Sequence, residues 1–95
     1  MSTKRRIINL KVRNHPGVMC HITGLFARRV FNLEGILCAP LAMDESISRI
    51  QLFVQENRRL EQLVRQLRKL YDVLELSISE DINDGIILDL KKWFG

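Results

Sequence analysis

A change of hydrophobic period near the amino terminus constrains the fold more than any other feature. Over residues 6–13 apolar and polar side chains alternate, which is the two-residue period of a strand with one buried face. From Val18 to about Arg29 the apolar residues instead recur at the spacing of an amphipathic helix. A strand therefore passes directly into a helix, and only the short turn of residues 14–17 separates them.

Two further strands follow that helix. Residues 31–41 predict a second strand, with Gly35 as a bend or bulge and Pro40 at its end or at a sheet edge. A polar turn at residues 44–46 leads into a new alternation over residues 47–55. The two strands therefore form a hairpin with a short loop.

A second helix and a fourth strand complete the pattern. Leucine and valine residues between Leu60 and Leu70 form a helical stripe, and Asn57 is placed to cap it. Residues 73–79 alternate again and predict the last strand. The order strand, helix, strand, strand, helix, strand is typical of an α+β, ferredoxin-like βαββαβ domain. In that fold both helices pack on one face of a four-stranded antiparallel sheet.

We expect this domain to occupy residues 1–80 and an extension to follow over residues 81–95. Five apolar residues of the extension recur at helical spacing: Ile86, Ile87, Leu90, Trp93 and Phe94. They predict a short C-terminal helix that docks on the same domain or on a partner. A fifth strand is the alternative.

Composition is that of one small domain. The chain has 95 residues, of which 46% are hydrophobic and 27% charged. No apolar run reaches the roughly 20 residues that span a bilayer, and the start has no signal-peptide block. We therefore expect a cytoplasmic protein that does not contact a membrane. Cys20 and Cys38 match neither a metal-ligand pair nor a disulfide framework, so we expect both as small buried hydrophobic residues.

The sequence offers no catalytic constellation. His15 and His21 are the only histidines, and neither has a carboxylate pair or a cysteine ligand set near it in sequence. The glycines are too far apart to form a phosphate-binding loop, and the serines have no base beside them. We expect a chain that is not an enzyme and that holds no metal or cofactor.

RNA recognition is a rival interpretation, because RNA-recognition modules share this topology and the formal net charge is +4. Such modules stack bases on aromatic residues of the exposed sheet face. The central strands offer a single aromatic residue, Phe53, and the basic residues are scattered. We therefore predict no nucleic-acid partner.

The turn at residues 14–17 is the best candidate for a binding site. Pro16 has a φ suited to the first turn of a helix, and Gly17 has no side chain to cover the first helical N–H groups. Such groups bind carboxylates well, and the Asn14 amide adds a second polar contact. Asn, Pro and Gly are also ordinary turn residues, so the turn by itself leaves both interpretations open.

Several stretches together carry a resemblance to a known family. They are residues 14–19 (NHPGVM), 24–29 (GLFARR), 31–38 (FNLEGILC), 59–63 (RLEQL) and 69–73 (KLYDV). The chain resembles the small regulatory subunit of acetohydroxyacid synthase, also called acetolactate synthase. The resemblance covers nearly the whole chain and is closest to the short form, which is little more than one ACT domain.

The resemblance implies a non-catalytic subunit in branched-chain amino-acid biosynthesis, which makes valine and isoleucine. It would activate a large catalytic subunit that carries thiamine diphosphate, magnesium and FAD, and it would confer feedback inhibition by valine. Two ACT domains would form a homodimer with the effector at their interface. The alternative is an ACT-type amino-acid sensor that regulates a different enzyme or a transcription factor.

The resemblance also implies a site shared between two chains, with Asn14, Pro16, Gly17 and Val18 from one chain and Asn32 and Leu33 from the other. His15 and Met19 line the same turn. The expected ligand-binding residues are Asn14, His15, Pro16, Gly17, Val18, Met19, Asn32, Leu33 and Ile36. The ligand carboxylate would meet the N–H groups of residues 17–19, and its branched side chain would pack on the apolar members of the set.

Overall fold

A computed structural model describes residues 4–14, 16–41, 43–80 and 92. Six elements follow one another in the predicted order. They are β1 (Arg5–Arg13), α1 (Val18–Arg28), β2 (Leu33–Pro40), β3 (Ile47–Gln55), α2 (Leu60–Arg68) and β4 (Val73–Glu80). His15 and, apart from Lys92, the predicted C-terminal extension with its helix lie outside the described residues.

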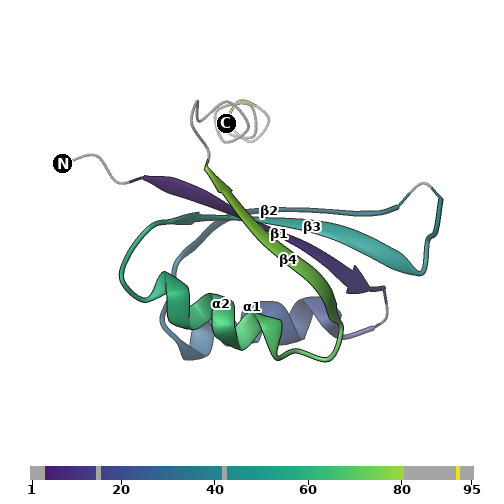
Figure 1. Ribbon diagram of the computed structural model, residues 1–95, viewed down its shortest axis with the longest axis horizontal. Helices are drawn as coiled ribbons and strands as arrows, with labels where there is room; N and C mark the ends of the chain where they lie inside the picture. The colour runs from purple at the N-terminus through teal and green to yellow at the C-terminus, as the bar shows by residue number, and fades with distance from the viewer. Residues whose placement is uncertain (1–3, 15, 42, 81–91, 93–95) are drawn as a thin grey trace.

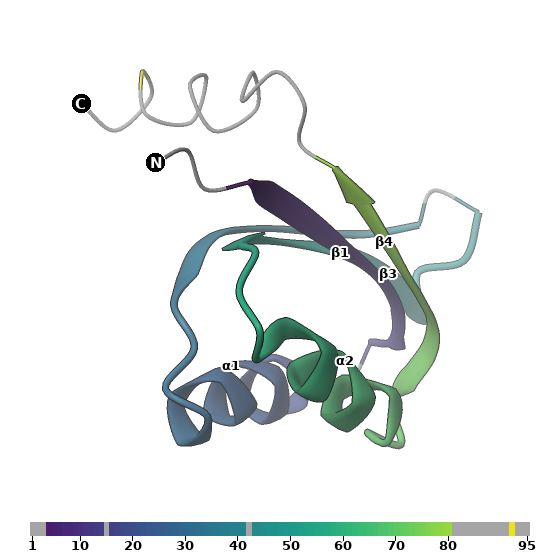
Figure 2. The same cartoon turned by 60° about the vertical axis from the view of Figure 1, so that its left-hand side comes forward.

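The sheet has the order β2-β3-β1-β4, and all three pairings are antiparallel. Both helices lie on one face of this sheet (Figures 1 and 2). In the described sheet β2 and β4 are therefore the edge strands. The predicted ferredoxin-like fold is confirmed.

The alternation in β1 sorts its side chains to two faces. Ile8, Leu10 and Val12 are buried together with the apolar faces of the two helices. The helix residues in this main core are Val18, Ile22, Leu25, Phe26, Leu60, Leu63, Val64 and Leu67. Each fully buried large aliphatic side chain contributes about 1.5–3 kcal/mol, so this layer is the main source of stability.

The second strand begins later than its sequence pattern predicts. Phe31 is not in the strand, because its N–H donates to the Phe26 carbonyl at 2.9 Å. The rings of Phe26 and Phe31 also meet edge to face, with centroids 5.9 Å apart. The predicted irregularity at Gly35 is present, since the β2–β3 register shifts between Leu33 and Gly35. Pro40 is the last residue of this edge strand, as expected.

The prediction that both cysteines are buried was wrong, because Cys20 and Cys38 are exposed. Cys20 lies two residues after Val18, and two residues turn a helix by about 200°. It therefore faces away from the buried side of α1. Cys38 lies in the edge strand β2, where one flank has no neighbouring strand in the described sheet.

The sheet face opposite to the helices, the open face, carries a second apolar cluster near the start of β1. Ile7 and Phe53 are paired residues on neighbouring strands, and both are buried, with Leu37 packed against them. Phe53 is 0% exposed. It is the only aromatic residue in the four strands. The open face of the described sheet therefore lacks an exposed aromatic platform for stacking bases.

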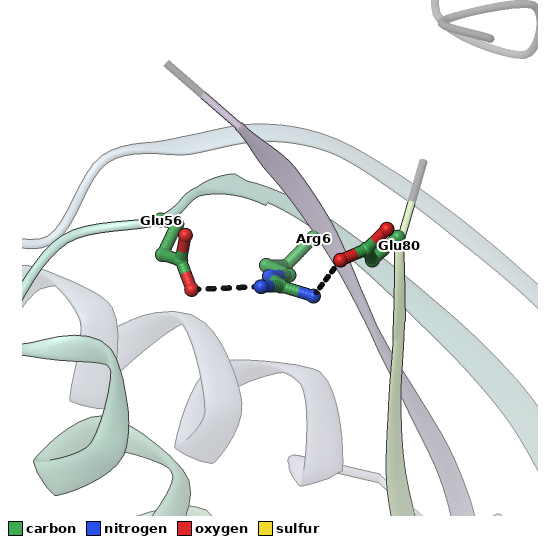
Figure 3. Close-up of polar contacts among 3 residues, drawn as sticks. All are labelled: Arg6, Glu56 and Glu80. Carbon is green, nitrogen blue, oxygen red and sulfur yellow. Dashed lines mark hydrogen bonds and ion pairs between the residues drawn. The ribbon is translucent and has the colours of Figure 1, made fainter. Parts of the chain in front are cut away.

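Ion pairs hold the same end of the sheet together. The Arg6 guanidinium donates to Glu56 and to Glu80, each at 2.9 Å (Figure 3). The hydrogen bond with Glu56 is the main cause that raises the pKa of Arg6 above its ordinary value. The Arg5 Nε lies 3.3 Å from the Glu34 carboxylate. We call this the paired end of the sheet, since both arginines that begin β1 have carboxylate partners there.

Candidate functional site

The strand-to-helix corner lies at the opposite end of β1. Gly17 is the N-cap residue of α1 and has φ 92° and ψ −12°, a left-handed conformation that favours glycine. A Cβ built on Gly17 would meet no described atom within 4 Å. Within the described residues, the side of Gly17 on which a side chain would stand is therefore open.

The corner offers hydrogen-bond donors and a partial positive charge. His21 N–H donates to the Gly17 carbonyl at 3.0 Å and makes the first full helical hydrogen bond. The N–H groups of Val18 and Met19 precede that bond, so the helix itself supplies no acceptor for them. The first turn of α1 also contains no acidic residue that would neutralise the helix dipole. A carboxylate would fit the chemistry of this corner.

Asn14 anchors the corner to the loop between β2 and β3. Its backbone N–H donates to the Ser46 carbonyl at 2.7 Å, and its side-chain Nδ2 donates to the Glu45 carbonyl at 3.0 Å. The side-chain oxygen of Asn14 accepts no hydrogen bond from a described residue. It is therefore available to accept a hydrogen bond from a ligand ammonium group.

The anchoring loop is itself held by a local hydrogen-bond pair. The Asp44 carboxylate accepts from the Ser46 hydroxyl at 2.6 Å and from the Ser46 N–H at 3.0 Å. These bonds, the hydroxyl first, lower the pKa of Asp44 below its ordinary value. Asp44 therefore stays ionised at neutral pH, and its carboxylate fixes the turn to which Asn14 is tied.

The other predicted site residues lie elsewhere in the same chain. Asn32 is exposed just before β2, and Leu33 and Ile36 are half-buried against the main core. Val54 of β3 pairs with Leu33 on one side and with Arg6 on the other. The corner instead follows Arg13, seven residues further along β1, which is about 23 Å at about 3.3 Å per residue. One chain therefore does not bring Asn32 and Leu33 to the corner.

Sequence reasoning missed the role of Asp72. Its side chain is 9% exposed, and its carboxylate lies 3.9 Å from His21 Nδ1. The Asp72 carbonyl also accepts from the Arg13 N–H at 2.9 Å, which ties the turn between α2 and β4 to β1 next to the corner. A single acidic residue between a helix and a strand gives no sequence signal of burial. His21 itself is exposed.

Within the described residues, no three metal-ligating side chains of the His, Cys, Asp and Glu types come together. No helix of the described part is both long and apolar enough to cross a bilayer.

Solved structures show the class of domain first. The chain superposes on the ACT domain of GTP pyrophosphokinase from Chlorobium tepidum with a TM-score of 0.67 at 19% identity, over 82% of this chain and 100% of that one. At this identity the likeness concerns the fold only. The fold is that of an ACT domain.

A comparison of sequences assigns the chain to one family among ACT domains. A family profile described as an AHAS small subunit-like ACT domain matches residues 8–75. The chain belongs to this family, which confirms the resemblance found in the sequence.

Relatives agree with the profile. The chain is 56% identical over 70 residues to the acetolactate synthase isozyme 1 small subunit of Escherichia coli K12, covering 74% of this chain and 72% of the relative. The acetolactate synthase small subunit structure from Thermotoga maritima has a TM-score of 0.72 at 28% identity, covering 84% of this chain. The chain spans 50% of that longer subunit. It also spans 49% of a Buchnera aphidicola small subunit, to which it is 38% identical over 79 residues.

Proposed function

We propose that this chain is a non-catalytic regulatory small subunit of an acetolactate synthase and that it binds valine as a feedback inhibitor. The observation that carries the valine site is the open corner at Gly17, where a Cβ would meet no described atom within 4 Å and the first turn of α1 has no acidic residue. Family membership and the similarity to acetolactate synthase small subunits support the role as a small subunit. In this proposal thiamine diphosphate, magnesium and FAD belong to the large catalytic subunit.

The edge strand β2 supports a dimer that would complete the site. Its last residue, Pro40, pairs with Ser48, close to the loop that holds Asn14, while its first residue lies at the paired end. If two copies pair antiparallel through β2, the beginning of one strand lies beside the end of the other. Asn32 of the partner subunit would then approach the corner, although the two lie far apart in one chain.

Each part of a bound amino acid has a proposed contact. The carboxylate would accept from the N–H groups of residues 17–19, and the ammonium group would donate to the amide oxygen of Asn14. The amide of Asn32 of the partner subunit would contact the polar groups from the other side. Val18 would line the branched side chain, with Leu33 and Ile36 of the partner subunit opposite.

A site at the seam between two chains gives a means of regulation. A ligand that touches both subunits favours the dimer arrangement that it binds more tightly. The catalytic subunit responds only if it, too, distinguishes between these arrangements, and the coupling is then reciprocal.

Reconstitution tests this function. The chain is mixed with the large subunit of an acetolactate synthase, and acetolactate production is followed during a valine titration. We expect the chain to raise activity and valine to lower it again. Valine binding without any effect on the large subunit would instead favour the alternative, an amino-acid sensor for a different enzyme or regulator.

A further inference from the structure

The open face of the sheet has a second half, which differs from the apolar cluster around Phe53. Lys11 and Arg49 lie on this face toward the far end of β1, and we call them the basic patch. Lys11 and Arg49 are directly opposite each other in the β1–β3 register. Like charges in this position destabilise a sheet, so the arrangement itself costs stability.

Neighbouring groups neutralise the positive charge of the basic patch only in part. Lys11 Nζ lies 3.4 Å from the Glu75 carboxylate on the next strand. Arg13, two residues further along β1, is not part of the patch, because its guanidinium lies 5.2 Å from the centroid of the Tyr71 ring, beside residues of α1. Arg49 is exposed and forms no ion pair with a described residue. An excess of positive charge therefore remains on this half of the face, and Arg49 is its most available member.

The surface beside the patch is hollow and polar. Asn9, Gln51 and Ser77 line a depression of about 700 Å³ together with Lys11 and Arg49. Gln51 Nε2 donates to the Asn9 side-chain oxygen at 3.0 Å, which fixes both amides. Glu75 also lines this depression and pairs with Lys11, so a partner carboxylate entering it would meet the Arg49 guanidinium first.

We propose that the basic patch is the surface on which an acidic patch of the catalytic large subunit docks. This inference rests on the proposed function, because that function supplies the partner. Complementary charge accelerates association and fixes the register of an interface. Lys11 lies three residues before Asn14, so the patch and the corner share the end of β1. A shift of the corner on effector binding would therefore reach the docking surface through one strand.

Charge also attracts nucleic acid, but the rest of the face favours a protein. Binding of single-stranded RNA to a sheet depends on exposed aromatic side chains that stack with bases. Phe53, the aromatic residue of the four strands, is fully buried. The open face of the described strands therefore offers charge and hydrogen bonds without a stacking platform.

Three variants test the docking surface in the reconstituted complex. Arg49→Glu reverses one charge of the patch, Arg49→Lys keeps it, and Arg58→Glu makes the same reversal at an exposed position before α2. Activation of the large subunit is measured as a function of chain concentration at about 50 mM and about 300 mM salt. Valine binding to each chain alone is measured by calorimetry.

We expect Arg49→Glu to raise the concentration for half-maximal activation by about ten-fold at low salt. Arg58→Glu is expected to change this concentration by less than about two-fold, and Arg49→Lys should stay close to wild type. Valine binding should be unchanged in all three variants. Equal behaviour of Arg49→Glu and Arg58→Glu, with an active wild type, would overturn the docking surface alone. A wild-type chain that never activates the large subunit would overturn the proposed function as well. If Arg49→Glu instead weakens only the binding of a uridine oligonucleotide, the patch serves nucleic acid and the proposal is wrong.

Discussion

The two ends of β1 differ in how their polar groups are used. At the paired end, Arg6 bridges two glutamates and Arg5 meets Glu34, and the Phe53 cluster lies beside them. At the other end, Arg49 forms no ion pair with a described residue, and a Cβ at Gly17 would meet no described atom within 4 Å. The charged groups that begin β1 are therefore paired within the chain. The other end carries a charged side chain without a described ion-pair partner, which suits binding.

The two ends of β1 therefore contribute to different properties, one to the stability of the fold and the other to binding. Changes at the paired end should lower the free energy of unfolding and leave the intrinsic affinity for the effector nearly unchanged. Changes at the corner should weaken effector binding more than they lower the free energy of unfolding.

The largest expected effect is on stability, at Phe53. Phe53→Ala removes a fully buried ring and should lower the free energy of unfolding by about 3–5 kcal/mol, since the cavity cannot collapse completely. Denaturant unfolding followed by circular dichroism measures this loss. Phe53→Leu is the matched control and should cost clearly less, while a Phe53→Ala protein as stable as wild type would show that this cluster contributes little.

The next effect is on the effector response, at Gly17. Gly17→Asp places a carboxylate where the ligand carboxylate is expected, so valine inhibition of the reconstituted enzyme should be lost. Any side chain at φ 92° adds backbone strain of roughly 1–2 kcal/mol. Gly17→Ala carries this strain without the charge, and it should keep most of the inhibition because no described atom lies near its methyl group. Equal valine curves for Gly17→Asp and the parent would refute the corner as the site.

Asn14 should show a smaller effect at the same end. Asn14→Ala removes the amide oxygen proposed for the ligand ammonium group and the hydrogen bond to Glu45. Each such bond is worth about 1 kcal/mol, so valine should bind roughly five- to ten-fold more weakly by calorimetry, with activation of the large subunit retained. Unchanged binding would make Asn14 only a turn residue.

The smallest effect is expected at Arg6. Arg6→Gln removes both exposed ion pairs of the paired end, which should lower the melting temperature slightly and leave the valine affinity unchanged (Figure 3). High salt should reduce the difference from wild type, because exposed ion pairs are screened. A strong loss of valine affinity in Arg6→Gln would contradict the separation between the two ends.

Local patterns predicted most of the fold, because hydrophobic period is a local property. The strand Ile47–Gln55 matches the sequence prediction to the residue, and α1 ends one residue before its expected limit. The burial of the two cysteines was predicted wrongly, because the burial of a small residue depends on which neighbours cover it. The ion pairs of Arg6 could not be predicted, because Glu56 and Glu80 lie 50 and 74 residues away in the chain.

The individual residues of the candidate site could be predicted from the sequence, but not how they come together in space. The turn residues that begin α1 follow from simple chemistry, and their open geometry at Gly17 agrees with it. No local pattern joins Asn32 to that corner, since one chain holds the two at opposite ends of the sheet. Only the resemblance to a known family, which implies a dimer, supplied that link.

The most direct test of a shared site uses two defective chains. Gly17→Asp damages the corner, and Asn32→Ala damages the half that is expected from the partner, so neither homodimer should bind valine well. A mixed dimer would contain one site with both defects and one intact site. We predict that refolding the two chains together restores calorimetric binding, with one valine per mixed dimer. No recovery of binding in a mixed dimer of proven composition would contradict a site built from two chains.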